Sequence, residues 1–252
     1  MSSKRDMPTR PSRANESVLA QYFTPFEVAA FMWESVQAYA EGLLGRRSRA
    51  LDPAAGEGVF LRAALQREII DPACLHGVEL DAELAANNSL ISAGAQIHQG
   101  NGLEYEGSAP WINSFDVVIG NPPFGRLGAS PTMAPVDPRR VNASSRTGLS
   151  RFLGGKPDKI PMELLFLERS IELAKPGGIV ALVLPQGVFA NQRVQAVRDR
   201  TLEYARVLAV FDLPESTFRS PGLRVKTGIL ILRKRGADDA AEGHALLHAA
   251  AG

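Results

Sequence analysis

Short apolar runs alternate with amphipathic stretches along most of the chain. This pattern is typical of repeated βα units and predicts a mainly parallel sheet. The expected strands lie near residues 49–52, 75–80, 95–99, 115–120, 178–184, 206–213 and 226–233. The expected helices lie near residues 25–44, 58–68, 82–93, 161–174 and 188–204.

Two strand patterns refine this fold. Residues 179–184 are apolar throughout, as expected of a central strand that is covered on both faces. The last two expected strands are separated by about a dozen residues, too few for a packed helix. They should therefore pair antiparallel, which predicts a doubly wound α/β sheet of seven strands that ends in an antiparallel hairpin.

Composition indicates a globular protein. The 252 residues suffice for one large α/β domain, with 45% hydrophobic and 22% charged residues. Cys74 is the only cysteine, so an internal disulfide is excluded and a cytoplasmic location is the default. No apolar stretch approaches the roughly 20 residues of a membrane span, so no membrane partner is expected. None of the four histidines has metal-ligand spacing with the cysteine, and no metal site is predicted.

Three segments do not fit compact structure. Residues 1–18 are expected to be a disordered basic tail, and residues 236–252 a frayed, alanine-rich tail. Residues 125–159 carry seven basic and two acidic side chains and several glycine and proline breaks. A loop of this length is either functional or a solvated insertion. We favour a mobile basic insertion that orders on a polyanion, within a domain that spans residues 19–235.

The tetrapeptide Asn121-Pro122-Pro123-Phe124 follows the apolar run 115–120. An Asn side-chain oxygen and a Pro main-chain carbonyl can together accept the two N–H bonds of a planar amino group. The Phe ring can lie against the flat system that carries this group. Proline has no N–H, so no backbone donor competes there. The tetrapeptide is therefore a candidate catalytic site for methylation of an exocyclic amine.

A second candidate site is the turn at residues 51–58, which follows a strand and precedes a helix. Gly56 and Gly58 let the backbone approach a ligand closely. The third glycine of the dinucleotide pattern is replaced by Leu61, and no Walker lysine follows. Asp52 would repel a pyrophosphate but suits a cationic ligand. These features favour S-adenosylmethionine (SAM), with Asp52, Ala54 and Gly56 as contacts; a purely structural turn is the alternative.

Three further segments are candidates for the same cofactor. Glu79, followed by Leu80, ends the second strand, where an acid can accept both ribose hydroxyls. Asn101-Gly102 follows the third strand and can reach the adenine edge, although a simple Asn-Gly turn is the alternative. The third segment lies before the first expected helix and comprises Gln21, Tyr22, Phe23 and Thr24. Thr24 can cap the first helix, with Pro25 at its first position, as a purely structural role. This role is compatible with holding the cofactor's carboxylate through the Thr hydroxyl and the helix N–H groups.

Taken together, the chain resembles the N6-adenine DNA methyltransferases. The resemblance is closest to the gamma-ordered methylation subunits of type I restriction-modification systems. In that family Tyr-Phe-Thr-Pro, Asp-Pro-Ala-x-Gly-x-Gly and Asn-Pro-Pro-Phe occur in this order, as they do here from Tyr22, Asp52 and Asn121. Similar downstream segments extend the resemblance from about Leu19 to Arg235. The family often has Asp in place of Asn101.

The resemblance implies a Rossmann-like SAM-dependent methyltransferase fold and methylation of a flipped adenine in DNA. It implies base stacking by Phe124 and a grip on the N6 amino group by Asn121 and Pro122. Family members that select their own DNA sequence carry a target-recognition domain beyond the last strand, where about 17 residues remain here. The net charge of +1 is also small for a protein that grips duplex DNA alone. Either a specificity partner or a missing domain is therefore expected, in a bacterial restriction-modification or related system.

Other functions remain open from the residues. Protein-glutamine and RNA methyltransferases also use Asn-Pro-Pro-aromatic, because an amide NH₂ needs the same grip. The N4-cytosine enzymes are a nearer alternative, but they more often have Ser or Asp before Pro-Pro and Tyr or Trp after it. A SAM-binding subunit without catalytic activity is the non-enzymatic alternative.

Overall fold

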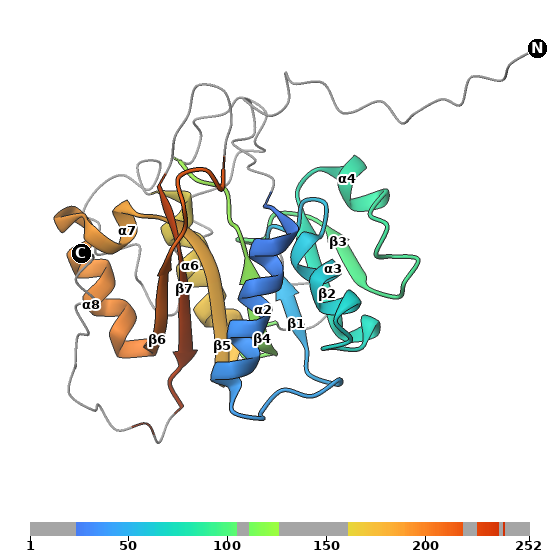
Figure 1. Cartoon of the computed structure of the whole chain (residues 1–252), viewed down its shortest axis with the longest axis horizontal. Helices are drawn as coiled ribbons and strands as arrows, with labels where there is room; N and C mark the ends of the chain where they lie inside the picture. Colours follow the sequence, from blue (N-terminus) through green and yellow to red (C-terminus); the bar gives the residue numbers. More distant parts are fainter. Residues whose placement is uncertain (1–23, 105–110, 126–160, 219–225, 237–238, 240–252) are drawn as a thin grey trace, which may run out of the picture.

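The computed structural model describes residues 24–104, 111–125, 161–218, 226–236 and 239. Within them, seven strands form one sheet in the order β3-β2-β1-β4-β5-β7-β6 (Figure 1). The strands are β1 (Ala50–Asp52), β2 (Leu75–Glu79), β3 (Gln96–Gln99), β4 (Phe115–Gly120), β5 (Ala174–Pro185), β6 (Ala205–Asp212) and β7 (Thr227–Lys234). Strands β1 to β5 pair in parallel, whereas β7 is antiparallel to both β5 and β6. The predicted doubly wound sheet and its antiparallel end are confirmed.

Helices cover both faces of the sheet. They are α2 (Phe26–Ala40), α3 (Val59–Gln66), α4 (Ala82–Ala86), α6 (Met162–Leu173), α7 (Gly187–Ala190) and α8 (Gln195–Tyr204), with 3-10 turns at Pro72–Cys74 and Gln192–Val194. In Figure 1, α2 and α3 lie in front of the sheet and α6 lies behind it. In the described part of the chain, no helix combines the length and apolar character needed to cross a bilayer.

Helices α2 and α4 end well before the position that the sequence pattern predicted. The first ends at Ala40, because Glu41 and Gly42 adopt left-handed conformations with φ of 53° and 80°. The helix expected over residues 82–93 ends at Ala86. Two residues later the side-chain oxygen of Asn88 accepts a hydrogen bond from the Leu90 N–H at 3.1 Å, which offers the backbone an alternative to the helix.

The segment expected to form one helix over residues 188–204 is divided in two. Asn191 is extended, and its side-chain oxygen accepts from the Arg193 N–H at 2.9 Å, which ends α7 and starts a new turn before α8. The strand expected from residue 178 begins earlier, at Ala174, directly after α6. Ala174 pairs with Phe115, and the register shifts between Phe115 and Val117, so the Pro-Gly-Gly segment is accommodated as an irregular strand start.

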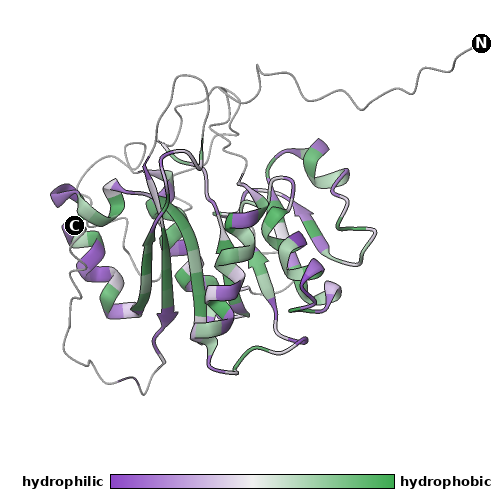
Figure 2. Ribbon diagram, in the orientation of Figure 1, coloured by the Kyte–Doolittle hydropathy of each residue, from purple (hydrophilic) through white to green (hydrophobic). Residues whose placement is uncertain are grey.

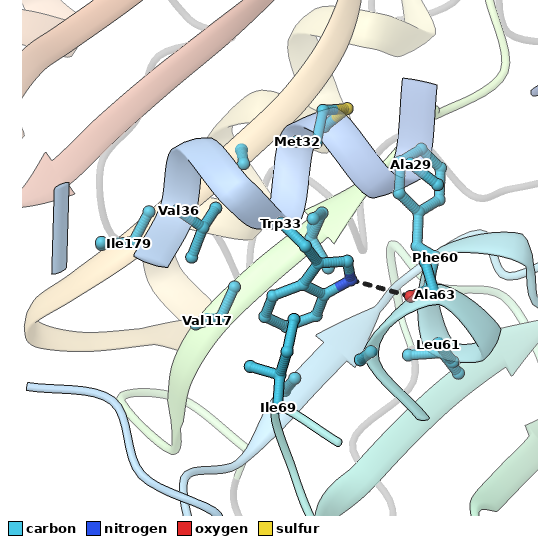
Figure 3. Packing of buried hydrophobic residues seen from close by; sticks show 14 of the residues in the cluster. Ala29, Met32, Trp33, Val36, Phe60, Leu61, Ala63, Ile69, Val117 and Ile179 are labelled. Atoms are coloured by element: carbon cyan, nitrogen blue, oxygen red, sulfur yellow. Dashed lines mark hydrogen bonds between the residues drawn. The ribbon is translucent and has the colours of Figure 1, made fainter. Parts of the chain in front are cut away.

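The buried core lies on both faces of the sheet. Figure 2 shows that the central strands are hydrophobic along most of their length, whereas α8 carries hydrophilic positions. On the α2 side, Trp33 is fully buried, and its indole N–H donates to the carbonyl oxygen of Phe60 in α3 at 2.8 Å (Figure 3). This bond joins α2 to the helix that follows the glycine turn. The packing of α2 on α3 therefore fixes the direction in which the chain leaves that turn.

We predict that Trp33→Phe lowers the free energy of unfolding by about 1–3 kcal/mol, because it removes a buried hydrogen bond and leaves a small cavity. Urea denaturation followed by circular dichroism measures this change. Leu43→Ala is the matched control, since Leu43 is 67% exposed and should change stability by less than about 0.5 kcal/mol. Equal stabilities of the Trp33→Phe variant and the unmodified protein would contradict this account of the core.

Candidate active site

Asp52 stands at the carboxyl end of β1, between β2 and β4, and is 1% exposed. One carboxylate oxygen, Oδ1, accepts from the Ala54 N–H at 3.1 Å. The other, Oδ2, has no hydrogen-bond partner among the described residues. Burial raises the pKa of the Asp52 carboxyl to about 7; the bond from Ala54 opposes this rise and the charge of Glu79 adds to it. A buried acceptor of this kind is suited to a cationic or N–H-bearing ligand.

The glycine turn after β1 is tied to the end of β2. Gly56 has φ of 52°, and its N–H donates to Oε2 of Glu79 at 2.7 Å. The other carboxylate oxygen of Glu79 accepts from the Asp81 N–H at 2.9 Å, and Glu79 is 5% exposed. Each carboxylate oxygen has a further lone pair, so Glu79 can hold the turn and still accept a hydroxyl. Its assignment to the ribose stays a prediction.

Asn88 is a residue of this site that the sequence reasoning missed. Its side-chain amide donates to the carbonyl oxygen of Gly56 at 3.3 Å, and the residue is 7% exposed. It braces the glycine turn from the segment after α4. The available signal was an Asn pair at residues 87–88 inside an expected helix, where Asn is unfavourable.

The segment after β3 approaches the segment after β1 very closely. A Cβ on Gly102 would lie 1.8 Å from the carbonyl oxygen of Pro53, so only glycine fits there. The side-chain oxygen of Asn101 accepts from the Leu103 N–H at 3.1 Å, which forms the local turn considered as an alternative. Contact of Asn101 with adenine is therefore still a prediction. Leu80 is half-buried, and its carbonyl accepts from the Gln99 side chain at 3.3 Å.

The Asn-Pro-Pro-Phe tetrapeptide lies at the end of β4, beside Asp52. A Cβ on Gly120 would stand 2.6 Å from Oδ1 of Asp52, so the glycine lets the two strand ends approach. The side-chain Nδ2 of Asn121 donates to Oγ1 of Thr24 at 3.0 Å. Two segments 97 residues apart in sequence are thereby joined.

The remaining residues of the tetrapeptide are partly or wholly enclosed. Pro122 is buried and Pro123 is half-buried. Phe124 is 9% exposed and packs in the core cluster on the α2 side of the sheet. The ring must therefore become more accessible before a base can stack on it.

Thr24 differs from its expected capping role. Helix α2 begins at Phe26, its N-cap position is Pro25, and no side chain caps it. The Thr24 hydroxyl instead accepts from Asn121, so the predicted cap is wrong and a contact between two motifs takes its place. Gln21, Tyr22 and Phe23 lie outside the described residues, as does the basic insertion from residue 126 to 159.

The exit from the tetrapeptide is fixed to the start of α6. The N–H of Gly125 donates to Oε2 of Glu163 at 3.1 Å, and the N–H of Met162 donates to the carbonyl of Gly125 at 2.7 Å. Burial raises the pKa of the Glu163 carboxyl, and hydrogen bonds from backbone N–H groups oppose this rise. Glu163 thus holds the backbone next to Phe124, a role that nothing in the sequence pattern indicated.

These contacts bring the turn after β1, the ends of β2 and β4, and the segment after β3 to one edge of the sheet. This edge is the usual ligand-binding edge of open α/β sheets. Asp52 and Glu79 provide buried acceptors, and Gly102 and Gly120 leave room where a side chain would intrude. The arrangement fits a nucleoside that carries a positive charge, which agrees with the properties of SAM.

The order of the strands, with β7 antiparallel, is that of class I methyltransferases. The sequence pattern of the family described as N-6 DNA Methylase matches residues 12–250. The chain therefore belongs to the N-6 DNA methylase family. Membership of this family implies SAM as the methyl donor.

Individual relatives are distant. Defense against restriction protein B of Escherichia phage P1 is 25% identical over 222 residues, which cover 87% of this chain and 8% of that protein. The methylase subunit of the type I restriction enzyme EcoEI from Escherichia coli is 26% identical over 238 residues, which cover 85% of this chain and 42% of the subunit. The chain thus spans less than half the length of either relative.

Solved structures support the same fold. The methyltransferase subunit of a type I restriction-modification system from Streptococcus thermophilus superposes with a TM-score of 0.62 and 22% identity. The superposition covers 87% of this chain and 47% of that subunit. At this level of identity the similarity establishes the arrangement of the sheet and helices.

We predict that SAM affinity rises as the pH is raised from about 5.5 to 7. Asp52, with a pKa of about 7, is mostly neutral at the lower pH, and only its ionised form attracts a cationic ligand. Isothermal titration calorimetry across this range measures the change. Asp52→Asn should bind SAM more weakly and lose the pH dependence. Asp71→Asn, which alters an exposed ion pair with Arg46, is the control and should keep it.

We further predict that Gly102→Ala weakens SAM binding about tenfold or more, because the added methyl group would collide with the backbone of Pro53. Calorimetry measures the affinity, and thermal unfolding reports the accompanying strain. The control is Gly45→Ala, since an added Cβ at exposed Gly45 meets no atom within 4 Å. Normal SAM binding by the Gly102→Ala variant would show that this contact does not shape the site.

Proposed function

We propose that this chain is the catalytic domain of an N6-adenine DNA methyltransferase. In this proposal it transfers a methyl group from SAM to the N6 amino group of an adenine that has been flipped out of duplex DNA. The observation that carries the proposal is the position of the Asn-Pro-Pro-Phe tetrapeptide directly beside the buried carboxylate of Asp52. The proposed amino-group grip and the proposed cofactor site would thus lie at one sheet edge.

Different residues would bind different parts of the cofactor. Asp52 would accept from the positively charged part of SAM, and Glu79 from the ribose hydroxyls. Gly56 and Gly102 let the backbone come close to the ligand. When bound, SAM would supply an electrophilic methyl group: the N–C bond forms as the S–C bond breaks, S-adenosylhomocysteine leaves as a neutral thioether, and the methylated nitrogen loses one proton to solvent.

The tetrapeptide would orient the amino group. The side-chain oxygen of Asn121 and the carbonyl of Pro122 would each accept one N6–H, which turns the nitrogen lone pair out of conjugation with the ring. Phe124 would support the base once its ring is accessible. The catalytic contribution is then positioning and electrostatic stabilisation of the developing charge, with no nucleophilic side chain required.

Two features of the chain bear on how a DNA sequence would be recognised. The chain spans less than half of the relatives described above, and its net charge is +1. Proteins that bind DNA by phosphate contacts usually have a basic surplus. We therefore propose that target recognition comes from a specificity subunit or a further domain, as part of a bacterial restriction-modification or related system.

Analysis of the methylated product distinguishes between the competing hypotheses about the substrate. Protein-glutamine and RNA methyltransferases need the same amide or amine grip, and a non-catalytic subunit would bind SAM without transfer. Incubation with radiolabelled SAM and either DNA, RNA or protein, followed by mass spectrometry of the digested products, distinguishes these possibilities. N6-methyladenine in DNA supports the proposal, whereas methylated glutamine, methylated RNA or N4-methylcytosine as the only product contradicts it.

We predict that Asn121→Ala abolishes methyl transfer to DNA while SAM affinity stays within a few-fold of the original, because the amide acts on the target amino group. A radiolabelled methyl assay and calorimetry measure the two quantities separately. Asn87→Ala removes an exposed Asn at the end of α4 and serves as the control. Full transfer activity in the Asn121→Ala variant would remove the tetrapeptide from the mechanism.

A further inference from the structure

The contact between Thr24 and Asn121 links a residue just before the first described helix to the amide at the end of β4. Oγ1 of Thr24 accepts from Nδ2 of Asn121 at 3.0 Å, and both residues are half-buried. An Asn side chain carries its donor and its acceptor on opposite sides of one planar amide group. Fixing Nδ2 therefore also fixes where Oδ1 points.

We propose that Thr24 is a positioning residue that sets the orientation of the Asn121 amide for methyl transfer. This inference rests on the proposed function, in which Oδ1 accepts from the target amino group. If the amide turned over, Nδ2 would face that amino group, and two donors would oppose each other. A hydroxyl can also donate, so the bond to Thr24 disfavours the turned-over amide when the hydroxyl hydrogen is given to another acceptor and Oγ1 can only accept from Asn121.

The Thr24 hydroxyl has capacity for a second bond. A hydroxyl accepts through two lone pairs and donates through one hydrogen, so accepting from Asn121 leaves its own hydrogen for another acceptor. The carboxylate of SAM, expected near this segment, is an acceptor of the right kind. Donation to it would polarise the hydroxyl and strengthen the bond from Asn121. The two roles of Thr24 are therefore compatible, and they make different experimental predictions.

The position of Thr24 is itself fixed. Pro25 follows it, and the Pro25 carbonyl accepts from the N–H groups of Val28 and Ala29 at 3.1 and 3.3 Å. Helix α2 is in turn held against α3 by the bond from Trp33 to Phe60. The packing of these two helices thus determines where the hydroxyl meets the amide.

The test compares Thr24→Val, which keeps the shape but removes the hydroxyl, with Thr24→Ser, which retains it. In ¹⁵N-labelled full chain, the side-chain NH₂ signals of Asn121 are assigned from their absence in Asn121→Ala. We expect these signals to shift in Thr24→Val and to stay in place in Thr24→Ser. At saturating SAM, single-turnover transfer to unmethylated genomic DNA should fall about tenfold in Thr24→Val and recover in Thr24→Ser.

Controls separate positioning from other effects. Thr201→Val removes a buried hydroxyl in α8 that donates to the Val197 carbonyl, and it should leave the Asn121 signals unchanged. The indole N–H signals of Trp33 and Trp111 report whether each variant is folded, and Thr24→Ala replaces Thr24→Val if the latter misfolds. Unmoved Asn121 signals in a folded variant without the hydroxyl overturn the proposal, even where SAM affinity falls. The NMR measurement does not depend on methyl transfer. It therefore tests the role of Thr24 even if the proposed activity fails.

Discussion

The candidate site depends on the close approach of two strand ends, β1 and β4. Gly120 has no side chain, so the end of β4 can lie against the carboxylate of Asp52. Any larger residue at Gly120 would displace either the carboxylate or the tetrapeptide that follows. Parallel pairing of the two strands sets their direction, and the glycine sets their separation at the edge. The methyl donor and the amino group that receives it would have to meet within this gap. A small change in the spacing of the two strand ends would therefore change the rate of methyl transfer.

A second constraint is electrostatic. Asp52 and Glu79 are both buried, and burial together with the charge of Glu79 raises the pKa of the Asp52 carboxyl. Backbone N–H groups of Ala54, Gly56 and Asp81 offset part of this cost by donating to them. A positively charged ligand would offset more. The backbone hydrogen bonds of the glycine turn and the buried carboxylates are thus in place without a ligand, and under the proposed function their charge would favour a cation.

The sequence was sufficient to predict the strands and the antiparallel pairing of the last two, because buried strands must be apolar and a short connection between β6 and β7 permits only antiparallel pairing. It did not predict that β7 lies between β5 and β6. It was less informative about helix ends. At Asn88 and Asn191 a side-chain hydrogen bond to the backbone replaced a helical one, and apolar periodicity does not register such competition. The bond between Thr24 and Asn121 and the bond from Gly125 to Glu163 join residues distant in sequence. The sequence motifs identified candidate segments of the site. Which side chains contact each other is seen only in the folded structure.

The position of β7 in the sheet affects how the domain can fold during its synthesis. This strand comes last among the seven described, yet it lies between β5 and β6, which precede it in the chain. Until residues 227–234 leave the ribosome, one edge of the apolar strand β5 has no partner. Unpaired apolar edges are prone to association with other chains. Premature termination before β7 should therefore yield an aggregation-prone product rather than a smaller working domain, even though Asp52, Glu79 and Asn121 would already have been synthesised.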